Sequence, residues 1–283
     1  MSERNFAWKQ IRAGAREDVR VGNNSDIADS VLWGRNVSVG SGCRIGPHSL
    51  ILDNAIIEDG CFIGPNCVIG EPTSGFYRVS ESYEFKPTRI GRDSIIRVGS
   101  VISENVRIGE QLRTGPYVTI RENTTIGSHC RIGSYGDIQP DIQIGDYSRL
   151  HSNVHLTQGA IVGKYVWIMP NCIFTNDSLF PLFTYAQPPV IGSFSVLGAS
   201  CFFYPGVRLG MHVVVAAGSR VKGNHEDFSF LSGDPARKIC DARRFFLEIE
   251  GRCRFPYPWP KHISKDYPWK DVPPEERRLE DYL

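Results

Sequence analysis

Residues 90–108 read IGRDSIIRVGSVISENVRI, in which an isoleucine returns at every sixth position. The same six-residue step occupies three stretches of the chain, 21–69, 90–174 and 191–221, and Thr114 is its only polar member. An amphipathic helix repeats every 3.6 residues and a half-buried strand every two residues, so neither element keeps this register. A fixed period that runs through most of a chain predicts a solenoid.

A smaller side chain stands two residues before each large one, as Val37 does before Val39 and Ser94 before Ile96. Residues two apart on a strand face the same side, so each hexad would place one large and one small side chain inside a narrow prism. Three hexads would close one triangular coil, with residues such as Gly46 at the sharp corners. The sequence therefore predicts an all-β fold, a left-handed parallel β-helix of about ten coils.

The cysteines fit the same register. Six of the eight cysteines fall in the small inward position, namely Cys43, Cys61, Cys67, Cys130, Cys172 and Cys201. A buried free thiol behaves as a small hydrophobic group. A metal site needs thiolates that converge with open access, which a filled prism denies. We therefore expect structural cysteines and no bound metal.

Two insertions interrupt the repeat, one after Ile69 and one after Phe174. Both follow the third hexad of a coil, so both loops should leave the prism at the same edge. Long loops on a rigid scaffold often carry function. The first and last hexads set the expected domain boundaries: an N-terminal cap at 1–20, the β-helix at 21–225 and a C-terminal region at 226–283.

The C-terminal region is expected to begin with a helix and to continue as an extended arm rich in proline and aromatic residues. Pro235 suits a helix start, and residues such as Ile239 and Phe246 could form an apolar stripe. The helix would cover the open end of the solenoid. The arm, from about Phe255, would pack on its own assembly or on a neighbouring subunit.

Charge and hydropathy exclude several classes of partner. The 283 residues include 32 basic and 31 acidic side chains, a net charge of +1. That balance provides no basic surface for nucleic acid and no polybasic patch for a membrane. No apolar run is long enough to span a bilayer, and the sequence MSERNFAWKQ lacks the apolar region of a signal peptide. A cytoplasmic protein is expected.

Four passages carry a resemblance to a known family. They are Gly70-Glu71-Pro72, Arg113-Thr114-Gly115 with Ile120-Arg121-Glu122, Thr175-Asn176-Asp177 with Pro181, and Gly233-Asp234-Pro235-Ala236-Arg237. With the hexad, they make the chain resemble the hexapeptide-repeat acyltransferases, particularly those that acylate amino groups of nucleotide-linked sugars. The resemblance spans about residues 21–240. It implies a homotrimer in which acetyl-CoA, or another acyl-CoA, and the acceptor lie in grooves between adjacent prisms.

The resemblance does not supply the catalytic base. Relatives of the lipid A branch carry Asn-x-His-x-x-His, whereas this chain has Gln158 where the last histidine would stand. Other relatives carry a histidine where this chain has Pro116. The base must therefore be argued from the residues of this chain.

Acyl transfer to an amine needs a group that accepts a proton near neutral pH. His151 and His155 lie outside the two inward positions and should face outward. Adding or subtracting 18 finds the neighbour on the next coil, about 4.8 Å away by strand spacing. His155 then stacks on Asp137, and Asn153 lies beside Tyr135. We therefore predict His155 as the base oriented by Asp137, with His151 as the second candidate; the alternative is that both belong to surface ladders.

The loops and the last coils supply the remaining candidates. In the first loop, aromatic rings could stack on a nucleobase and a cation could meet a phosphate, at Phe76, Tyr77, Arg78 and Tyr83. Polar contacts to the sugar are expected from Asn153 and Tyr135 on the coils and from Asn176 and Asp177 in the second loop. The phosphates of coenzyme A are expected to meet basic residues of the late coils, at Arg220, Lys222, Arg237 and Lys238.

Three other functions compete with this interpretation. Acylation of a sugar hydroxyl would use the same features. A γ-type carbonic anhydrase needs three histidines converging on zinc, but His151 and His155 are four residues apart and no third histidine stands at a matching place on the prism. His48, His129 and His212 fall at hexad corners, where we expect them to be solvated. A non-catalytic scaffold is disfavoured by the long loops and the His-Asn-His cluster.

Overall fold

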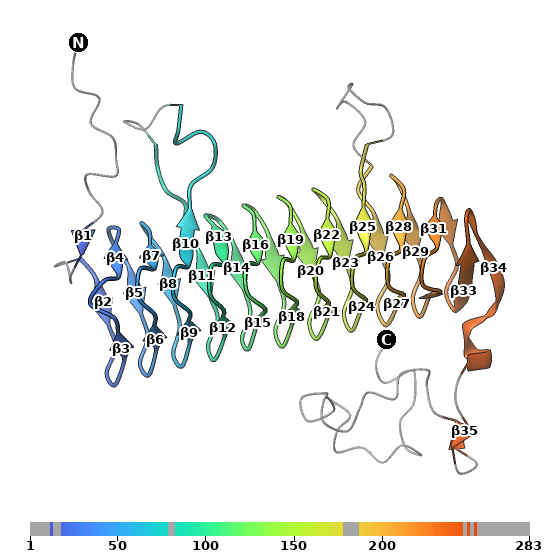
Figure 1. Ribbon diagram of the computed structural model, residues 1–283, viewed down its shortest axis with the longest axis horizontal. Coiled ribbons are helices and arrows are strands. Elements are labelled where there is room, and N and C mark those ends of the chain that lie inside the picture. The colour runs from blue at the N-terminus through green and yellow to red at the C-terminus, as the bar shows by residue number, and fades with distance from the viewer. Residues whose placement is uncertain are drawn as a thin grey trace.

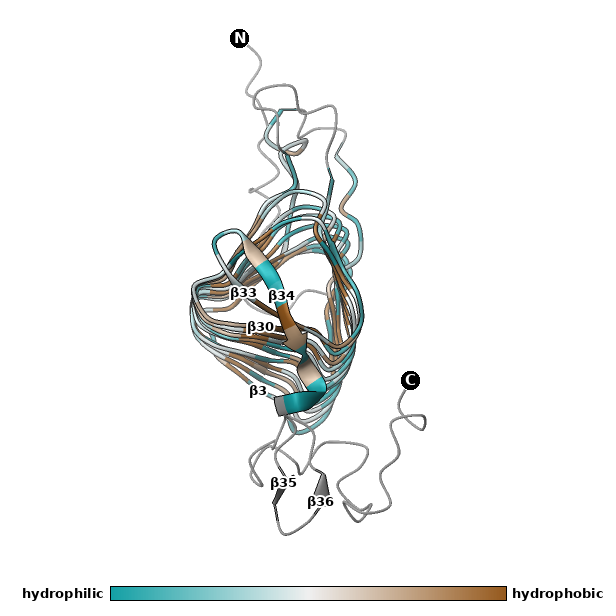
Figure 2. Cartoon of the chain, turned by 90° about the vertical axis from the view of Figure 1, so that its right-hand side faces the viewer, coloured by the Kyte–Doolittle hydropathy of each residue, from teal (hydrophilic) through white to brown (hydrophobic). Residues whose placement is uncertain are grey.

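The computed structural model describes residues 18–78, 83–177 and 187–245, together with short strands at 12–13, 248–249 and 252–253. Its strands stack in parallel along one axis (Figure 1) and enclose a triangular section (Figure 2). The parallel β-helix predicted from the hexad is confirmed. Among the described residues, no helix is long and apolar enough to cross a membrane.

Each coil contributes one short strand to each of three sheets. Sheet A contains β1 (Arg12–Ala13), β4 (Leu32–Trp33), β7 (Leu50–Ile51), β10 (Val68–Glu71), β13 (Val101–Ser103), β16 (Thr119–Ile120), β19 (Asp137–Ile138), β22 (His155–Leu156), β25 (Ile173–Phe174), β28 (Phe202–Phe203) and β31 (Arg220–Val221). Sheet B contains β2 (Arg20–Val21), β5 (Ser38–Val39), β8 (Ile56–Ile57), β11 (Arg89–Ile90), β14 (Arg107–Ile108), β17 (Thr125–Ile126), β20 (Gln143–Ile144), β23 (Ile161–Val162), β26 (Val190–Ile191), β29 (Arg208–Leu209) and β32 (Asn224–His225).

Sheet C is the third wall and extends furthest toward the C-terminus. It contains β3 (Asp26–Ile27), β6 (Arg44–Ile45), β9 (Phe62–Ile63), β12 (Ile95–Ile96), β15 (Arg113–Thr114), β18 (Arg131–Ile132), β21 (Arg149–Leu150), β24 (Trp167–Ile168), β27 (Val196–Leu197), β30 (Val214–Val215), β33 (Ser229–Gly233) and β34 (Ala236–Asp241). A separate hairpin pairs β35 (Glu248–Ile249) with β36 (Arg252–Cys253).

The core is the column of inward residues that the hexad predicts. The second residue of most strands is buried, and so is the small residue two positions earlier. The six cysteines expected in the small position are all buried and free. The exception, Thr114, is also buried, because its hydroxyl accepts the backbone N–H of Arg97 at 2.9 Å. A satisfied hydroxyl can replace an apolar side chain in a core at little cost.

Both insertions leave the prism at the edge between sheets A and B, as predicted. The first lies between β10 and β11 and the second between β25 and β26, and both project to the same side in Figure 1. Residues 79–82 of the first and 178–186 of the second, including Pro181, lie outside the described residues. The two loops therefore flank one edge of sheet A.

The helix predicted after Pro235 is wrong. Residues Ala236–Asp241 form β34, which runs antiparallel to β33 and ends sheet C at the viewer's side in Figure 2. The exposed edge of β33 offers backbone partners that a helix could not use. The proposed apolar stripe is also absent at Ile239, which is 60% exposed. A 3-10 helix, η3 (Ala242–Phe245), follows, and the predicted arm from Phe255 lies outside the described residues.

Candidate active site

Sheet A carries the candidate site on its outward face. The first residue of each two-residue strand points away from the core, which aligns Thr119, Asp137, His155 and Ile173 on consecutive strands. Residues that are 18 apart in these coils lie on adjacent strands of this sheet. The hexad therefore sets which polar side chains become neighbours on the surface.

His155 and Asp137 form the pair that the coil step predicts. Nδ1 of His155 lies 2.8 Å from Oδ2 of Asp137, and both side chains are partly exposed. The hydrogen bond from His155 holds the pKa of Asp137 below its usual range, so the carboxylate is ionised and can only accept. The proton of the neutral imidazole then resides on Nδ1, which leaves Nε2 as the basic nitrogen.

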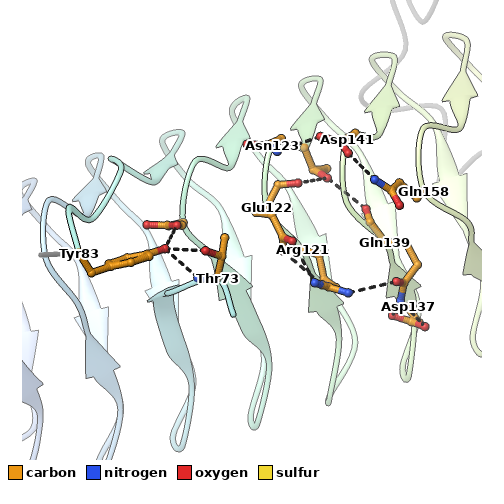
Figure 3. A network of polar contacts seen from close by, with 11 residues as sticks. Thr73, Tyr83, Arg121, Glu122, Asn123, Asp137, Gln139, Asp141 and Gln158 are labelled. Atoms are coloured by element: carbon orange, nitrogen blue, oxygen red, sulfur yellow. Dashed lines mark hydrogen bonds and ion pairs between the residues drawn. The ribbon is translucent and has the colours of Figure 1, made fainter. Parts of the chain in front are cut away.

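A polar network holds Asp137 from its other side (Figure 3). Gln139 donates from Nε2 to both carboxylate oxygens of Asp137, at 2.9 and 3.1 Å. The amide oxygen of Gln139 accepts from Nη1 of Arg121 at 3.4 Å. Arg121 also contacts both carboxylate oxygens of Glu122, at 2.9 and 3.2 Å. The orientation of the carboxylate beside His155 is thus fixed by two further side chains.

His151 occupies a different wall of the prism. It follows β21 of sheet C, where its ring stacks on Trp167 with centroids 5.7 Å apart. The indole Nε1–H of Trp167 donates to Nε2 of His151 at 2.5 Å. Burial, together with the charge of Arg149, lowers the pKa of His151. Because Nε2 accepts a hydrogen bond, the proton of the neutral ring resides on Nδ1, so this histidine is poorly arranged to accept another.

An exposed aromatic pair lies at the corner between sheets C and A. The rings of Tyr117 and Tyr135 stack with centroids 5.5 Å apart and planes 11° from parallel, and they are 51% and 60% exposed. Asn153 takes the next corner position, since its backbone N–H donates to Ser134. The structure thus places Tyr135 and Asn153 at the edge of the sheet that carries His155.

The first loop does not present its aromatic residues as predicted. Phe76 is 2% exposed and packs against Tyr77, Tyr83 and Phe85, with ring centroids 5.2 to 5.6 Å away. A nucleobase cannot reach a ring buried in this cluster, so the assignment of Phe76 to base stacking is wrong. The cluster instead gives the loop its own small core.

Hydroxyl groups fix the same loop to the solenoid. Tyr83 bonds to Thr73 at 2.8 Å and to the carboxylate of Glu104, and Tyr77 donates to Glu71 at 2.5 Å. Burial followed by the bond to Glu71 raises the pKa of Tyr77 to about 12. Arg78, at the end of the described segment, is exposed. Of the four predicted residues, Tyr77 and Arg78 remain accessible.

The second loop begins close to the polar network. Asn176 donates from Nδ2 to the backbone oxygen of Gln158 at 3.2 Å, and Gln158 donates to Asp141 at 2.7 Å. Asn176 and Asp177 are both half-buried. They lie at the A–B edge, across sheet A from Tyr135. The predicted sugar-contacting residues therefore border sheet A on both sides.

The four basic residues predicted for coenzyme A differ in their contacts. Arg220 is the outward residue of β31, lies over the ring of Phe202 at 5.6 Å and pairs with Asp234 at 3.2 Å. Lys238 pairs with Glu226 at 3.6 Å, whereas Lys222 and Arg237 are exposed. Only Arg220 shares the outward face of sheet A with His155.

Of the three histidines at hexad corners, His48 is solvated as predicted and His212 is not. His48 is exposed, and His129 is half-buried beside Glu110 at 3.5 Å. His212 is 3% exposed between the rings of Phe194 and Phe228, each 4.8 Å away, so the prediction that it is solvated is wrong. Side chains at the same corner of successive coils stack on one another. The position of a residue within its own hexad does not reveal this contact. Among the described residues, no three potential ligands are grouped to hold a metal.

Comparison with known proteins identifies the repeat. The family model of the bacterial transferase hexapeptide (six repeats) matches residues 36–71, and that of the hexapeptide repeat of succinyl-transferase matches residues 188–222. No curated protein matches the sequence. The chain therefore contains transferase hexapeptides near both ends of the solenoid and resembles the hexapeptide-repeat acyltransferases.

Several solved structures are similar to the chain. A hexapeptide-repeat acetyltransferase from Vibrio cholerae is 26% identical over 36% of this chain and 62% of its own, with a TM-score of 0.33. The match thus spans less than two thirds of that protein. UDP-N-acetylglucosamine acyltransferase from Campylobacter jejuni is 18% identical over 81% of this chain and 73% of its own, with a TM-score of 0.39. PerB from Caulobacter crescentus, solved with CoA and GDP-perosamine, is 18% identical over 62% and 71%, with a TM-score of 0.30.

Proposed function

We propose that this protein transfers an acyl group, most simply acetyl, from acyl-CoA to the amino group of a nucleotide-linked amino sugar in the cytoplasm. The observation that carries the proposal is the His155–Asp137 pair on the outward face of sheet A. The carboxylate fixes the tautomer of the imidazole, and the partly exposed ring can meet a substrate. The resemblance to hexapeptide-repeat acyltransferases supports the choice of reaction.

His155 acts as the general base. The acceptor nitrogen attacks the thioester carbonyl carbon, and its proton passes to Nε2 of His155. The C–S bond then breaks, and coenzyme A leaves as a thiolate that takes this proton back from the imidazolium. Asp137 stabilises the charged ring between the two steps without receiving the proton itself, as the aspartate of a catalytic triad does.

Sheet A also provides a path for the acyl donor. Ile173, Phe202 and Arg220 follow His155 on consecutive strands. The apolar pair can carry the pantetheine arm, and Arg220 stands about 14 Å from His155 by three strand spacings, where it can meet a phosphate. Lys222 and Arg237 at the final coil would reinforce this contact.

The acceptor would enter from the edges of the same sheet. Tyr135 offers an exposed ring face on which a nucleobase can stack, while Asn153, Asn176 and Asp177 can bond to sugar hydroxyl groups. In the homotrimer that we propose, a neighbouring prism would close the groove over sheet A. Holding the amine and the thioester together is the largest contribution such a groove can make.

Release of free coenzyme A thiol from acetyl-CoA, with a panel of nucleotide-linked amino sugars, tests the proposal. We expect His155→Ala to lower kcat by a factor of about 10² to 10⁴ and His151→Ala to change it little, with the oligomeric state of both variants unchanged. Equal turnover by all three proteins would exclude both His155 and His151 as the base. Turnover only with hydroxyl acceptors would indicate sugar O-acylation by the same pair. If no acceptor works, binding of coenzyme A decides whether the panel or the activity is at fault.

A further inference from the structure

The residues that directly follow the strands of sheet A form a row beside the one that carries His155. In this row Gln139 donates to Asp137, two residues before it, at 2.9 Å. Side chains two residues apart in these coils therefore meet on the outward side of the sheet. Thr157 stands in the same relation to His155, on the next coil. The Cα atoms of Thr157 and His155 are about 6.6 Å apart by strand geometry.

The backbone ladder along this row is interrupted at Thr157. The N–H groups of Gln139 and Thr175, its neighbours on the coils before and after, each donate to the backbone oxygen of the following coil at 3.0 Å. Within the described residues, the N–H of Thr157 makes no such bond, and β22 pairs with β25 through His155 and Ile173 alone. An unpaired backbone donor costs about as much free energy as a lost hydrogen bond, so a ligand that accepts from it offsets this cost.

The side chain of Thr157 offers a second donor. In the part of the chain that the structure describes, its hydroxyl makes no hydrogen bond, whereas the hydroxyl of Thr175 donates to the backbone oxygen of Phe203 at 2.9 Å. Thr157 is 7% exposed, which keeps most water away from both donors while leaving a small opening. Hydrogen bonds to a developing charge are stronger in such a place than in water. Two unused donors of one residue thus lie beside the candidate base.

Acyl transfer needs donors of this kind. When the amine attacks the thioester, an electron pair of the C=O bond moves onto the oxygen, and the pair returns to carbon as the C–S bond breaks. Fixed donors that meet this oxyanion lower the barrier, and loss of one donor costs a factor of about 10² to 10³ in kcat. The N–H of the neutral His155 ring is directed at Asp137, so the oxyanion needs donors from elsewhere.

We propose that Thr157 is a catalytic residue whose backbone N–H and hydroxyl bind the oxyanion formed from the thioester carbonyl. The assignment rests on the proposed acyl transfer and supplies the donors that this reaction requires. Nδ1 of His155 faces Asp137, so Nε2 is turned away from that carboxylate and toward the acyl donor. Two hydrogen bonds of about 2.9 Å, one from the attacking nitrogen to Nε2 and one from Thr157 to the oxyanion, span the separation with one tetrahedral carbon between them.

Turnover of acetyl-CoA with the amino-sugar acceptors, measured for Thr157→Val and Thr157→Ser, tests the assignment. Thr157→Val keeps the shape of the side chain and removes the hydroxyl, so kcat should fall about 100-fold with little change in the KM for acetyl-CoA. Thr157→Ser keeps the hydroxyl and should retain kcat within about fivefold of wild type. Thr175→Val is the matched control, because it removes a hydroxyl that the backbone already uses, and its kcat should stay within about threefold.

The pH dependence of kcat separates a direct role of Thr157 from one that acts through His155. A donor to the oxyanion leaves the profile of Thr157→Val parallel to that of wild type, because His155 titrates as before. A shifted profile, or equal kcat in Thr157→Val and wild type, would overturn the assignment and leave acyl transfer in place. An equal loss in Thr157→Val and Thr157→Ser would also overturn it, since the hydroxyl would not be the group that matters. If wild type turns over no acceptor, the proposed function fails and this assignment fails with it.

Discussion

The indole N–H of Trp167 donates to Nε2 of His151 at 2.5 Å, so the acceptor nitrogen of this imidazole is already occupied. His155 has the opposite arrangement, since its Nδ1 faces a carboxylate and its Nε2 is the basic nitrogen. Two histidines four residues apart thus differ in chemistry because they lie on different walls of the prism. The difference separates a candidate base on sheet A from a histidine whose acceptor nitrogen is already bonded at sheet C.

Trp167→Phe should leave catalysis intact. The substitution keeps a ring to stack on His151 but removes the indole donor, so Nε2 of His151 is released. If His155 is the base, kcat and its pH dependence should stay within about twofold of wild type. Steady-state turnover between pH 5 and 9 provides the measurement. A change of tenfold or more would implicate His151 in the chemistry.

Gln139→Leu should slow the reaction by about three- to tenfold without changing the KM for acyl-CoA, because it removes both bonds that orient Asp137. Gln139 acts through Asp137, so it is a positioning residue. Gln143→Leu, an exposed glutamine on sheet B, is the matched control. Altered KM with constant kcat would instead place Gln139 in substrate binding.

The position of a residue in the hexad predicts the wall of the prism on which it lies. Part of the candidate site could therefore be predicted from the sequence. The His155–Asp137 contact follows from a step of 18, because strand register fixes neighbours on a parallel sheet. The edge that carries both loops follows from the same count. The exception at Thr114 could be found but not explained, since the hexad does not encode the bond that the Thr114 hydroxyl accepts from the backbone N–H of Arg97.

Contacts that do not follow the coil step could not be predicted. Trp167 reaches His151 across a separation of 16 residues, and Phe76 turns inward because the loop builds its own core. The strand at Ala236–Asp241 forms because β33 offers an open edge, a tertiary effect that overrides local preference. The conformations of irregular segments depend on tertiary contacts, which the six-residue repeat does not specify.

Gly99→Ala should weaken binding of the acceptor. The backbone of Gly99 has φ of 69°, and an added Cβ would lie 2.4 Å from the ring of Tyr117, which must then move and disturb Tyr135. Gly42→Ala is the control, because its φ is 67° but nothing lies within 4 Å of the added carbon. Both variants should lose about 1 kcal/mol of stability from backbone strain. Only Gly99→Ala should raise the KM for the nucleotide-linked acceptor, and an equal KM in both would remove the tyrosine pair from the site.

His212 should make the fold less stable in mild acid. Burial lowers the pKa of His212 from 6.5 to about 4, so the unfolded chain binds a proton in this range while the folded chain does not. Stability from the neutral ring is fully present above pH 6.5 and is lost as the pH falls toward 4. At pH 5 the loss is about 2 kcal/mol.

His212→Phe should remove this loss while preserving the stack between Phe194 and Phe228. Urea unfolding at pH 7 and pH 5, at a fixed protein concentration, should therefore show a smaller decrease for His212→Phe than for wild type. His48→Phe, at an exposed corner, should retain the full decrease and serves as the control. An identical decrease in His212→Phe and wild type would mean that His212 is protonated in the folded state, and that its column of rings is open to water at this level of the solenoid.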